Sequence, residues 1–270
     1  EYVKKYQPGQ TVPLYFSAQV DATPVAYGVF NGKDVKASVR ETKGVGSGVY
    51  LTFVSDKPLT VTAKVGLSYT SVENARINLE KEAAGRSFDE VKETSHKTWE
   101  EYLSRIRVES SKKDDLVKFY TGLYHALLGR GLANDVNGAY PKNDGTVGQL
   151  PMKDGKPVHN VYNTDAAWGA QWNLSQLWAL AYPEYLSDYI SSHLTVYQDA
   201  GWLADGLANC RYVSGVGTNL LSTIIAGAYQ CGIRDFDTKL AYEACLKNEL
   251  DGKDRPFGAG KVNTADFVKY

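Results

Sequence analysis

Carboxylates in polar, aromatic-rich segments are the residues of this 270-residue chain that could do chemistry. Hydrolysis of a glycosidic bond needs two carboxyl groups, one that protonates the leaving oxygen and one that activates water or attacks the sugar. Tyr and Trp suit the sugar itself, because each offers a flat apolar face and a polar edge. The chain places five aspartates in or beside such segments: Asp135, Asp144, Asp165, Asp199 and Asp205. We therefore expect a protein that handles carbohydrate.

Two of these aspartates have competing structural interpretations. Asp165 comes directly before Ala166-Ala167-Trp168, so it is either a helix N-cap or a residue that contacts substrate. Asp205 lies in the segment Gly201 to Gly206, which follows a predicted helix, and is either a turn residue or a functional acid. The sequence pattern alone leaves both alternatives open.

Other motifs and the composition exclude several classes of protein. The chain has no P-loop, no G-x-G-x-x-G and no H-E-x-x-H, and its three cysteines form no C-x-x-C pair. One disulfide is compatible with the sequence, but neither a disulfide framework nor a zinc site is predicted. The net charge of −1 without a basic run argues against a dedicated nucleic-acid-binding protein. No apolar stretch approaches the ~20 residues that span a bilayer.

Aromatic residues and histidines also allow two interpretations. The chain contains 19 Tyr and 5 Trp, which either fill a helical core or form sugar-binding surfaces. His125 lies on a predicted helix and is expected to be a core or interface residue. His159 lies in a long loop, which makes it the better ligand candidate of the two.

The sequence predicts antiparallel strands between residue 10 and about residue 70. β-branched and aromatic residues or strict alternation mark four segments, with turn signals at Asn31-Gly32 and at 44–48: Thr11–Val20, Pro24–Phe30, Val49–Val54 and Leu59–Val65. This pattern predicts part of an antiparallel sandwich.

The hydrophobic period then changes to that of a helix. Ser87 and Glu90 form a capping box that opens a helix to about Arg105. Gly201 and Gly232 are expected C-caps. The predicted helices cover 71–82, 87–105, 112–131, 166–182, 184–200, 216–231 and 236–250. The long connection 131–163 is of the kind that is functional or disordered, and the helices suggest a bundle or a toroid of helical hairpins.

The ends of the chain indicate a segment of a longer protein. No signal-peptide pattern follows Glu1, and Asn263 to Asp266 resembles a helix start only a few residues before Tyr270. The alternative is a short terminal helix that ends there.

The order of segments resembles glycoside hydrolase family 92, the calcium-dependent, inverting exo-α-mannosidases found largely in glycan-degrading bacteria. The resemblance extends over about residues 60–270. It is carried by Val65–Arg76, Trp99–Arg107, Phe119–Leu128, Asp135–Tyr140, Ala226–Ile233 and Asp235–Ala244.

This resemblance implies an architecture of three parts. Residues 1–70 would be part of an N-terminal antiparallel β-sandwich, 71–110 linker helices, and 111–270 the first half of an (α/α)6 toroid. The implied activity is that of a glycosidase acting on α-mannosides, of the α-1,2-mannosidase type. The implied calcium ligands and catalytic base lie outside this chain, so no metal ligand is assigned here. The implied location is periplasmic or extracellular, and the implied partners are a glycan and the remainder of the polypeptide.

Departures from the family pattern define the predicted site. Gly169 and Trp172 stand where the family has an Asp and an Arg, and residues 207–219 contain no carboxylate where the family has its general acid. Asp205 is then the only local acid and is predicted to be catalytic. Four further residues are predicted to bind substrate in one cavity with it: Asp165, Trp168, Trp202 and Arg211. Arg211 would suit an anionic group such as a phosphate or acidic sugar, or alternatively forms a bridge to Asp205.

Three functions remain compatible with these observations. The first is a divergent family 92 glycosidase. The second is a glycan-binding relative without catalysis. The third is a helical interaction protein unrelated to sugars.

Overall fold

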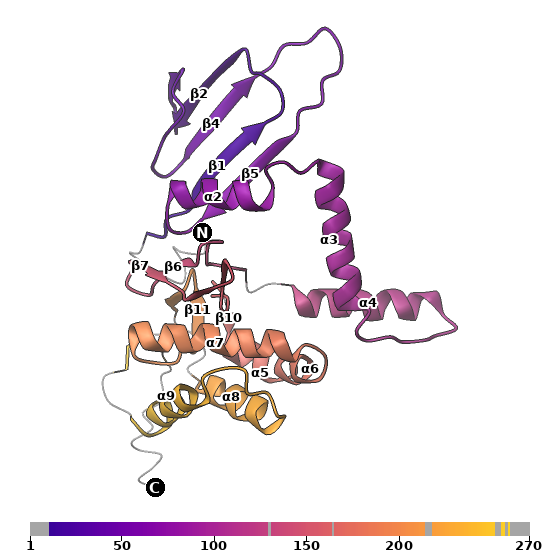
Figure 1. The fold of residues 1–270 in the computed structure, drawn as a ribbon, viewed down its shortest axis with the longest axis vertical. Helices are drawn as coiled ribbons and strands as arrows, with labels where there is room; N and C mark the ends of the chain where they lie inside the picture. The colour runs from indigo at the N-terminus through magenta and orange to yellow at the C-terminus, as the bar shows by residue number, and fades with distance from the viewer. Residues whose placement is uncertain are drawn as a thin grey trace.

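The structure is a computed structural model that describes residues 11–128, 131–163, 165–213 and 218–251, together with Arg255, Pro256 and Ala259. Strands come first, and helices dominate from Val72 onward, which confirms the predicted change of period. In Figure 1 the first strands lie at one end of the long axis and helices α5 to α9 at the other, while α3 and α4 project to one side. The sandwich, the toroid and the three-part division stay predictions. The predicted helix start at Asn263 lies outside the described residues.

Two small antiparallel sheets form the N-terminal part. One places β2 (Ala26–Asn31) between β3 (Asp34–Ala37) and β4 (Ser47–Thr52). The other pairs β1 (Tyr15–Val20) with β5 (Ala63–Ser68). The strand predicted at 59–65 is therefore displaced toward the C-terminus. Its partner β1 ends at Val20, and beyond it the amide of Asp21 still donates to the Thr62 carbonyl, while the Thr62 amide donates to the Asp21 side chain, so the regular ladder stops at Ala63.

Helix α2 (Val72–Glu82) packs against the β1–β5 pair. Ser71 caps it by accepting a hydrogen bond from the amide of Asn74, and Ala75, Asn78 and Leu79 form its buried face. Gly66 of β5 lies so close that an added Cβ would come within 2.1 Å of the Ala75 carbonyl oxygen. The sheet and the helix therefore meet through a position that only glycine can occupy.

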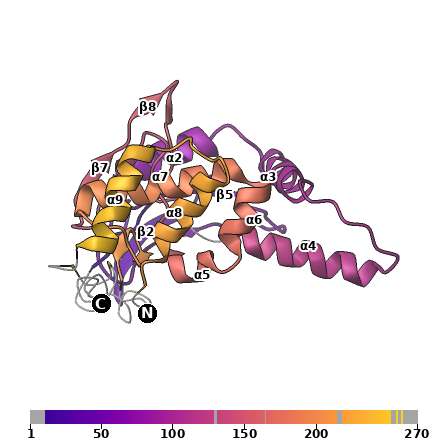
Figure 2. The same cartoon turned by 90° about the horizontal axis from the view of Figure 1, so that it is seen from below.

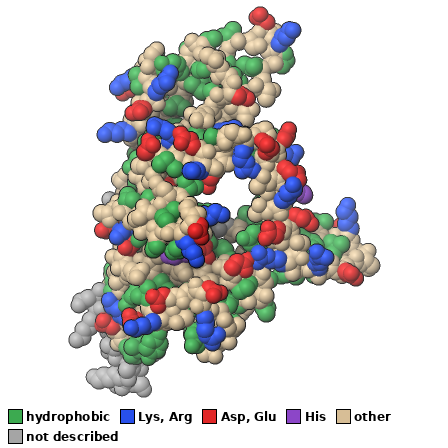
Figure 3. Space-filling view, in the orientation of Figure 1, with side chains coloured by type: hydrophobic (Ala, Val, Ile, Leu, Met, Phe, Trp, Pro, Cys, Tyr) green, Lys and Arg blue, Asp and Glu red, His purple; other side chains and the backbone are tan. Residues whose placement is uncertain are grey.

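Helices α3 (Phe88–Leu103) and α4 (Lys113–Leu127) connect the strands to the helical body. The predicted capping box of Ser87 and Glu90 is present. Figure 3 shows an opening between α3 and the body, with acidic and basic side chains interspersed around it.

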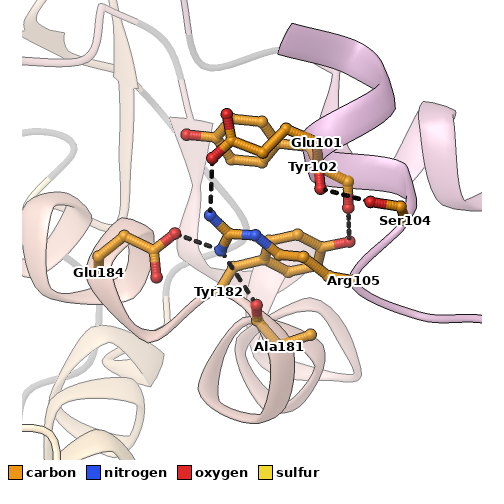
Figure 4. A network of polar contacts seen from close by, with 7 residues as sticks. All are labelled: Glu101, Tyr102, Ser104, Arg105, Ala181, Tyr182 and Glu184. Carbon is orange, nitrogen blue, oxygen red and sulfur yellow. Dashed lines mark hydrogen bonds and ion pairs between the residues drawn. The ribbon is translucent and has the colours of Figure 1, made fainter. Parts of the chain in front are cut away.

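The end of α3 is fastened to the body by Arg105 (Figure 4). Its guanidinium carbon lies 4.7 Å from the ring centroid of Tyr102 and 5.2 Å from that of Tyr182. The same group donates to the Ala181 carbonyl oxygen at 3.2 Å and forms an ion pair with Glu184. These contacts join α3 to the start of α7.

The helical body contains α5 (Ala167–Gln171), α6 (Leu174–Ala181), α7 (Pro183–Ala200), α8 (Leu220–Gln230) and α9 (Thr238–Leu250). Seen from below, α8 and α9 lie across α7 (Figure 2). Trp178, Tyr182, Tyr189 and Ile190 are at most 1% exposed in the core between them. Gly201 ends α7 with a φ of 84°, as predicted. In the part of the chain that the structure describes, no helix is long and apolar enough to cross a membrane.

Two details of the helical region differ from the sequence prediction. The helix predicted at 166–182 is two helices, because Asn173 leaves the helical conformation with a φ of −157°. Short strands also occur in segments predicted to be helix and loop. These are β6 (Ala139–Pro141), β7 (Val147–Gln149), β8 (Met152–Lys153), β9 (Lys156–Pro157), β10 (Asp165–Ala166), β11 (Gly206–Ala208) and β12 (Arg211–Tyr212). Strands of two or three residues are too short to show a period in the sequence.

Candidate functional site

A three-stranded sheet brings together the two segments that carry the predicted site residues. β11 is the central strand, with β10 on one side and β12 on the other. Asp165 pairs with Leu207, and Ala208 pairs with Arg211. The amide of Ala167 donates to the Asp205 carbonyl oxygen at 3.1 Å, which extends the same contact. Asp165, Asp205 and Arg211 therefore lie on neighbouring stretches of backbone although up to 46 residues separate them in sequence.

The turn between β11 and β12 is strained. Asn209 and Cys210 have φ values of 51° and 61°, so both central residues of this two-residue hairpin lie in the left-handed region. Two positive φ values match the twist of a tight hairpin, but a non-glycine residue there costs on the order of 1 kcal/mol. Cys210 is 1% exposed, and burial raises the pKa of its thiol. We therefore treat Cys210 as a packed residue of the turn and not as a nucleophile.

Asp205 is buried beside this sheet. Its side chain accepts hydrogen bonds from the amide of Thr218, at 3.0 Å, and from the Thr218 hydroxyl. Because Thr218 precedes α8, the carboxylate ties the end of the Gly201–Gly206 segment to the start of that helix. A residue that is 2% exposed needs some opening before it can meet a substrate. The predicted role of Asp205 as an acid stays a prediction.

Arg211 lies against the tip of the β6–β7 hairpin. A Cβ added at Gly145 would come within 2.9 Å of one Arg211 guanidinium nitrogen, and Gly145 has a φ of 87°. The next residue, Tyr212, donates its amide to the Asn143 side-chain oxygen at 2.8 Å. The hairpin tip therefore sets the position of β12.

The two predicted stacking residues have different surroundings. Trp168, on α5, is 41% exposed. Trp202 is 7% exposed, and two cations lie against its ring: the Lys247 nitrogen at 4.6 Å and the Arg255 guanidinium carbon at 4.9 Å from the centroid. The Trp202 carbonyl also accepts from the Tyr212 hydroxyl, which links it to β12. Trp168 is thus partly exposed, whereas Trp202 is buried against two cations.

The structure bears on two interpretations left open by the sequence, that of Asp165 as a helix N-cap and that of His159 as a ligand. The N-cap of α5 is Ala166, so Asp165 is a strand residue and does not occupy the N-cap position. Both ring nitrogens of His159 contact protein groups: the Asn160 carbonyl oxygen at 2.9 Å and the Thr195 hydroxyl at 3.3 Å. His159 is therefore engaged in holding its loop. A cavity shared by all five predicted site residues stays a prediction.

Asp199, one of the five aspartates named from the sequence, has two partners near the site that the sequence did not indicate. The Tyr140 hydroxyl donates to Asp199 at 2.8 Å, and the Lys142 ammonium lies 2.9 Å from the other carboxylate oxygen. Burial, together with the hydrogen bond to Asp199, raises the pKa of Tyr140, and the hydrogen bond to Asp199 raises the pKa of Lys142. The signal that could have found this group is a polar stripe along α7 at helical spacing, which includes Asp188, Ser192, Thr195 and Asp199.

The described residues contain no cluster of three or more His, Cys, Asp or Glu side chains able to hold a metal ion. Asp135, the most deeply buried carboxylate of the long loop, is instead surrounded by neutral donors. It accepts from Asn78 at 2.7 Å and from Ser68 at 3.0 Å, and also from Thr70. This arrangement fastens the loop to α2 and β5, so Asp135 is a structural residue.

Comparisons with known proteins agree on one family. Residues 74–270 match the model of the glycosyl hydrolase family 92 catalytic domain. An uncharacterized secreted glycosidase of Arthroderma benhamiae is 26% identical over 243 residues, which are 87% of this chain and 25% of that protein.

Solved structures show the same fold. A family GH92 inverting mannosidase of Bacteroides thetaiotaomicron matches with a TM-score of 0.79 at 21% identity, over 96% of this chain and 35% of that one. A GH92 α-mannosidase of the same organism, in complex with mannoimidazole, gives 0.74 at 20% identity, over 86% and 30%. The chain thus spans between a quarter and about a third of the length of these relatives.

Proposed function

Because the chain belongs to glycosyl hydrolase family 92, we propose that the whole protein is a glycosidase that cleaves α-mannosides or related glycans with inversion. The observation that carries the proposal is the match of residues 74–270 to the family's catalytic-domain model. The mannosidases with the same fold support mannose as the sugar. We further propose that the bond cleaved is an α-1,2 linkage.

The proposed roles within this chain follow from the chemistry of each side chain. Trp168 would stack on a sugar ring with its open face, and Asp165 would contact the sugar from β10. Trp202 would support the site from beneath β12. Asp205 would protonate the leaving oxygen, because it is the nearest carboxylate to residues 207–219, which hold none.

Arg211 points to the kind of leaving group. A planar guanidinium binds phosphate or carboxylate oxygens with two parallel hydrogen bonds. A glycan with an anionic group next to the scissile bond would match this residue.

Calcium, which the family implies, finds no ligand set among the residues that the structure describes. We therefore assign no step of the reaction to a metal on this chain. Export to the periplasm or the extracellular space is proposed from the family and from the secreted relative.

The test is sugar release by the full-length protein. Purified protein is incubated with α-1,2-, α-1,3- and α-1,6-mannobiose and with mannosyl phosphate diesters, and free mannose is measured by chromatography. Proton NMR of the first product should show β-mannose, because inversion of an α-mannoside gives the β-anomer. Initial release of α-mannose would exclude inversion.

The second candidate function is glycan binding without catalysis. The burial of Asp205 and its two bonds to Thr218 favour this alternative. Calorimetric titration with the same glycans separates the two, since a binder would take up a glycan and release no mannose. If the protein neither binds a glycan nor releases mannose, the third function, a helical interaction protein unrelated to sugars, is the one that fits.

A further inference from the structure

One face of α7 holds the long loop that precedes the candidate site. Asp188, Ser192, Thr195 and Asp199 follow one another at i, i+4, i+7 and i+11, which places them in one stripe along the helix. Each contacts the loop. Asp188 accepts from the Asn160 amide at 2.8 Å and from the Tyr162 hydroxyl at 2.6 Å, Ser192 accepts from the Tyr162 amide at 2.9 Å, and Thr195 meets His159 at 3.3 Å.

Asp199 ends this stripe and is the member that reaches the β6–β7 hairpin. Its carboxylate, 13% exposed, binds the Tyr140 hydroxyl on β6 and the Lys142 ammonium at the start of the turn. Both bonds involve an ionised group and are therefore stronger than neutral hydrogen bonds. They fix the hairpin to the last turn of α7.

The turn that Lys142 opens is closed on itself. The Gly145 amide donates to the Lys142 carbonyl at 3.0 Å, and the Lys142 amide donates to the Thr146 carbonyl at 2.8 Å. Asp144 accepts from the amide and hydroxyl of Thr146 at 2.8 and 2.7 Å. A shift at Lys142 would therefore move the whole tip.

That tip contacts β12 at two consecutive residues. The Asn143 side chain accepts from the Tyr212 amide, and Gly145 lies against the guanidinium of Arg211. A continuous path of contacts thus runs from Asp199 through Lys142 and the turn to Arg211. The same hairpin thus connects the Asp199 carboxylate, which binds Lys142, to the Tyr212 amide, which binds Asn143.

We infer that Asp199 is a positioning residue of the candidate site, which acts through the β6–β7 hairpin to hold Arg211 and β12 in place. The structural part, coupling of Asp199 to β12, stands by itself. The consequence for substrate rests on the proposed function, in which Arg211 contacts the substrate.

The structural part is tested by hydrogen exchange on the full-length protein. Asp199→Asn keeps the shape and an acceptor for Tyr140 but loses the ion pair with Lys142. Exchange in peptides that cover 139–149 and 206–213 should become about fivefold faster, the size expected for a local loss of about 1 kcal/mol. Lys142→Gln breaks the same pair from the other side and should give the same pattern.

The matched control is Glu184→Gln. It removes one negative charge from the same helix, at the Arg105 contact and far from the hairpin in sequence. Exchange in 206–213 should stay as in the wild type. Faster exchange confined to 139–149 in Asp199→Asn, or an equal change in the control, would overturn the coupling.

The kinetic consequence separates positioning from general damage. If Arg211 holds the substrate, Asp199→Asn should raise KM about tenfold with little change in kcat, because uniform binding is lost. Faster exchange in 206–213 with an unchanged KM would refute the role in the site while leaving the coupling intact. A wild-type protein that releases no sugar refutes the proposed function, and the exchange experiment still decides the coupling.

Discussion

Asp205 is held by an amide and a hydroxyl of the same residue, Thr218, in a place where water has little access. Such a carboxylate can be a fixed structural acceptor or an acid that acts after a local opening. In the second role the catalytic contacts would form only with substrate bound. Replacing the carboxylate with a neutral amide distinguishes the two roles, because only the loss of an acid would lower the rate of sugar release.

Asp205→Asn in the full-length protein should reduce sugar release by roughly 10²-fold or more, as expected for the loss of a general acid. The amide can still accept from Thr218, so thermal unfolding should change little. Initial rates on the best mannoside measure the effect. Unchanged turnover would identify Asp205 as a turn residue.

Gly145 tests the contact between the hairpin tip and Arg211. Gly145→Ala places a methyl group 2.9 Å from the guanidinium and requires a φ of 87° that alanine disfavours. We expect a loss of about 1–2 kcal/mol in unfolding free energy from the backbone and a raised KM from the displaced arginine.

Gly155→Ala is the matched control. Gly155 also has a positive φ, of 73°, but no atom lies within 4 Å of its added Cβ. It should lose similar stability in urea unfolding and keep the wild-type KM. An equal KM effect in both variants would show that the arginine contact does not matter.

At the scale of elements, α7 organises the helical region from both faces. Its apolar residues, including Leu186, Tyr189 and Ile190, enter the core, while its polar stripe binds the loop 139–163. These side-chain hydrogen bonds hold the loop against α7. Tyr140 and Tyr162 donate two of these hydrogen bonds, so their ionisation should lower the free energy of unfolding.

Stability should fall as the pH rises above about 10. Burial, then the negative charge of Asp188, raises the pKa of Tyr162 above its ordinary value of 10.0, and Tyr140 is shifted in the same direction. A raised folded-state pKa gives stability that is complete below the unfolded pKa and is lost as the pH rises toward the folded value. Urea unfolding at pH 8, 10 and 11 measures the fall.

Tyr162→Phe supplies the control for this pH effect. It lacks the hydroxyl, so we expect it to be about 1–3 kcal/mol less stable at pH 8, where the bond to Asp188 is intact in the wild type. The difference between the two proteins should narrow above pH 10. A constant difference up to pH 11 would assign the alkaline loss to other groups.

At the scale of the whole molecule, two groups of contacts among the described residues help to join the strands to the rest of the chain. Asp135 fastens the long loop to α2 and β5, and Arg105 fastens the end of α3 to α6 and α7 (Figure 4). Several helices also expose large apolar side chains, among them Trp172 at 74%, Leu180 at 86% and Tyr242 at 67%. The chain spans only part of its relatives' length.

Arg105→Ala should loosen α3 from the body. It removes the ion pair with Glu184, the bond to the Ala181 carbonyl and two ring contacts, while the stacked pair of Tyr102 and Tyr182 remains. We expect faster proteolysis in 104–112 and a loss of about 1–2 kcal/mol in unfolding free energy. Arg107→Ala, whose described bond is to the nearby Ser104 carbonyl, is the control and should behave as the wild type.

The sequence by itself determined what depends on neighbours along the chain. The Ser87–Glu90 capping box, the glycine that ends α7 and the change of period after Ser68 all follow from interactions within a few residues. The family followed from the order of such segments, and the comparisons confirm it. The sequence analysis predicted that the segments around residues 165 and 205–211 share a site, and in the structure strands of these two segments pair in one sheet.

Tertiary structure alone decided the partners of the polar side chains. Tyr140 meets Asp199 across 59 residues, and Asn143 meets Tyr212 across 69. Strands of two or three residues, such as β10 and β12, leave no periodic trace because long-range pairing, not local propensity, creates them. The burial of Asp205 and the cations beside Trp202 were hidden for the same reason: exposure depends on which distant elements pack over a residue.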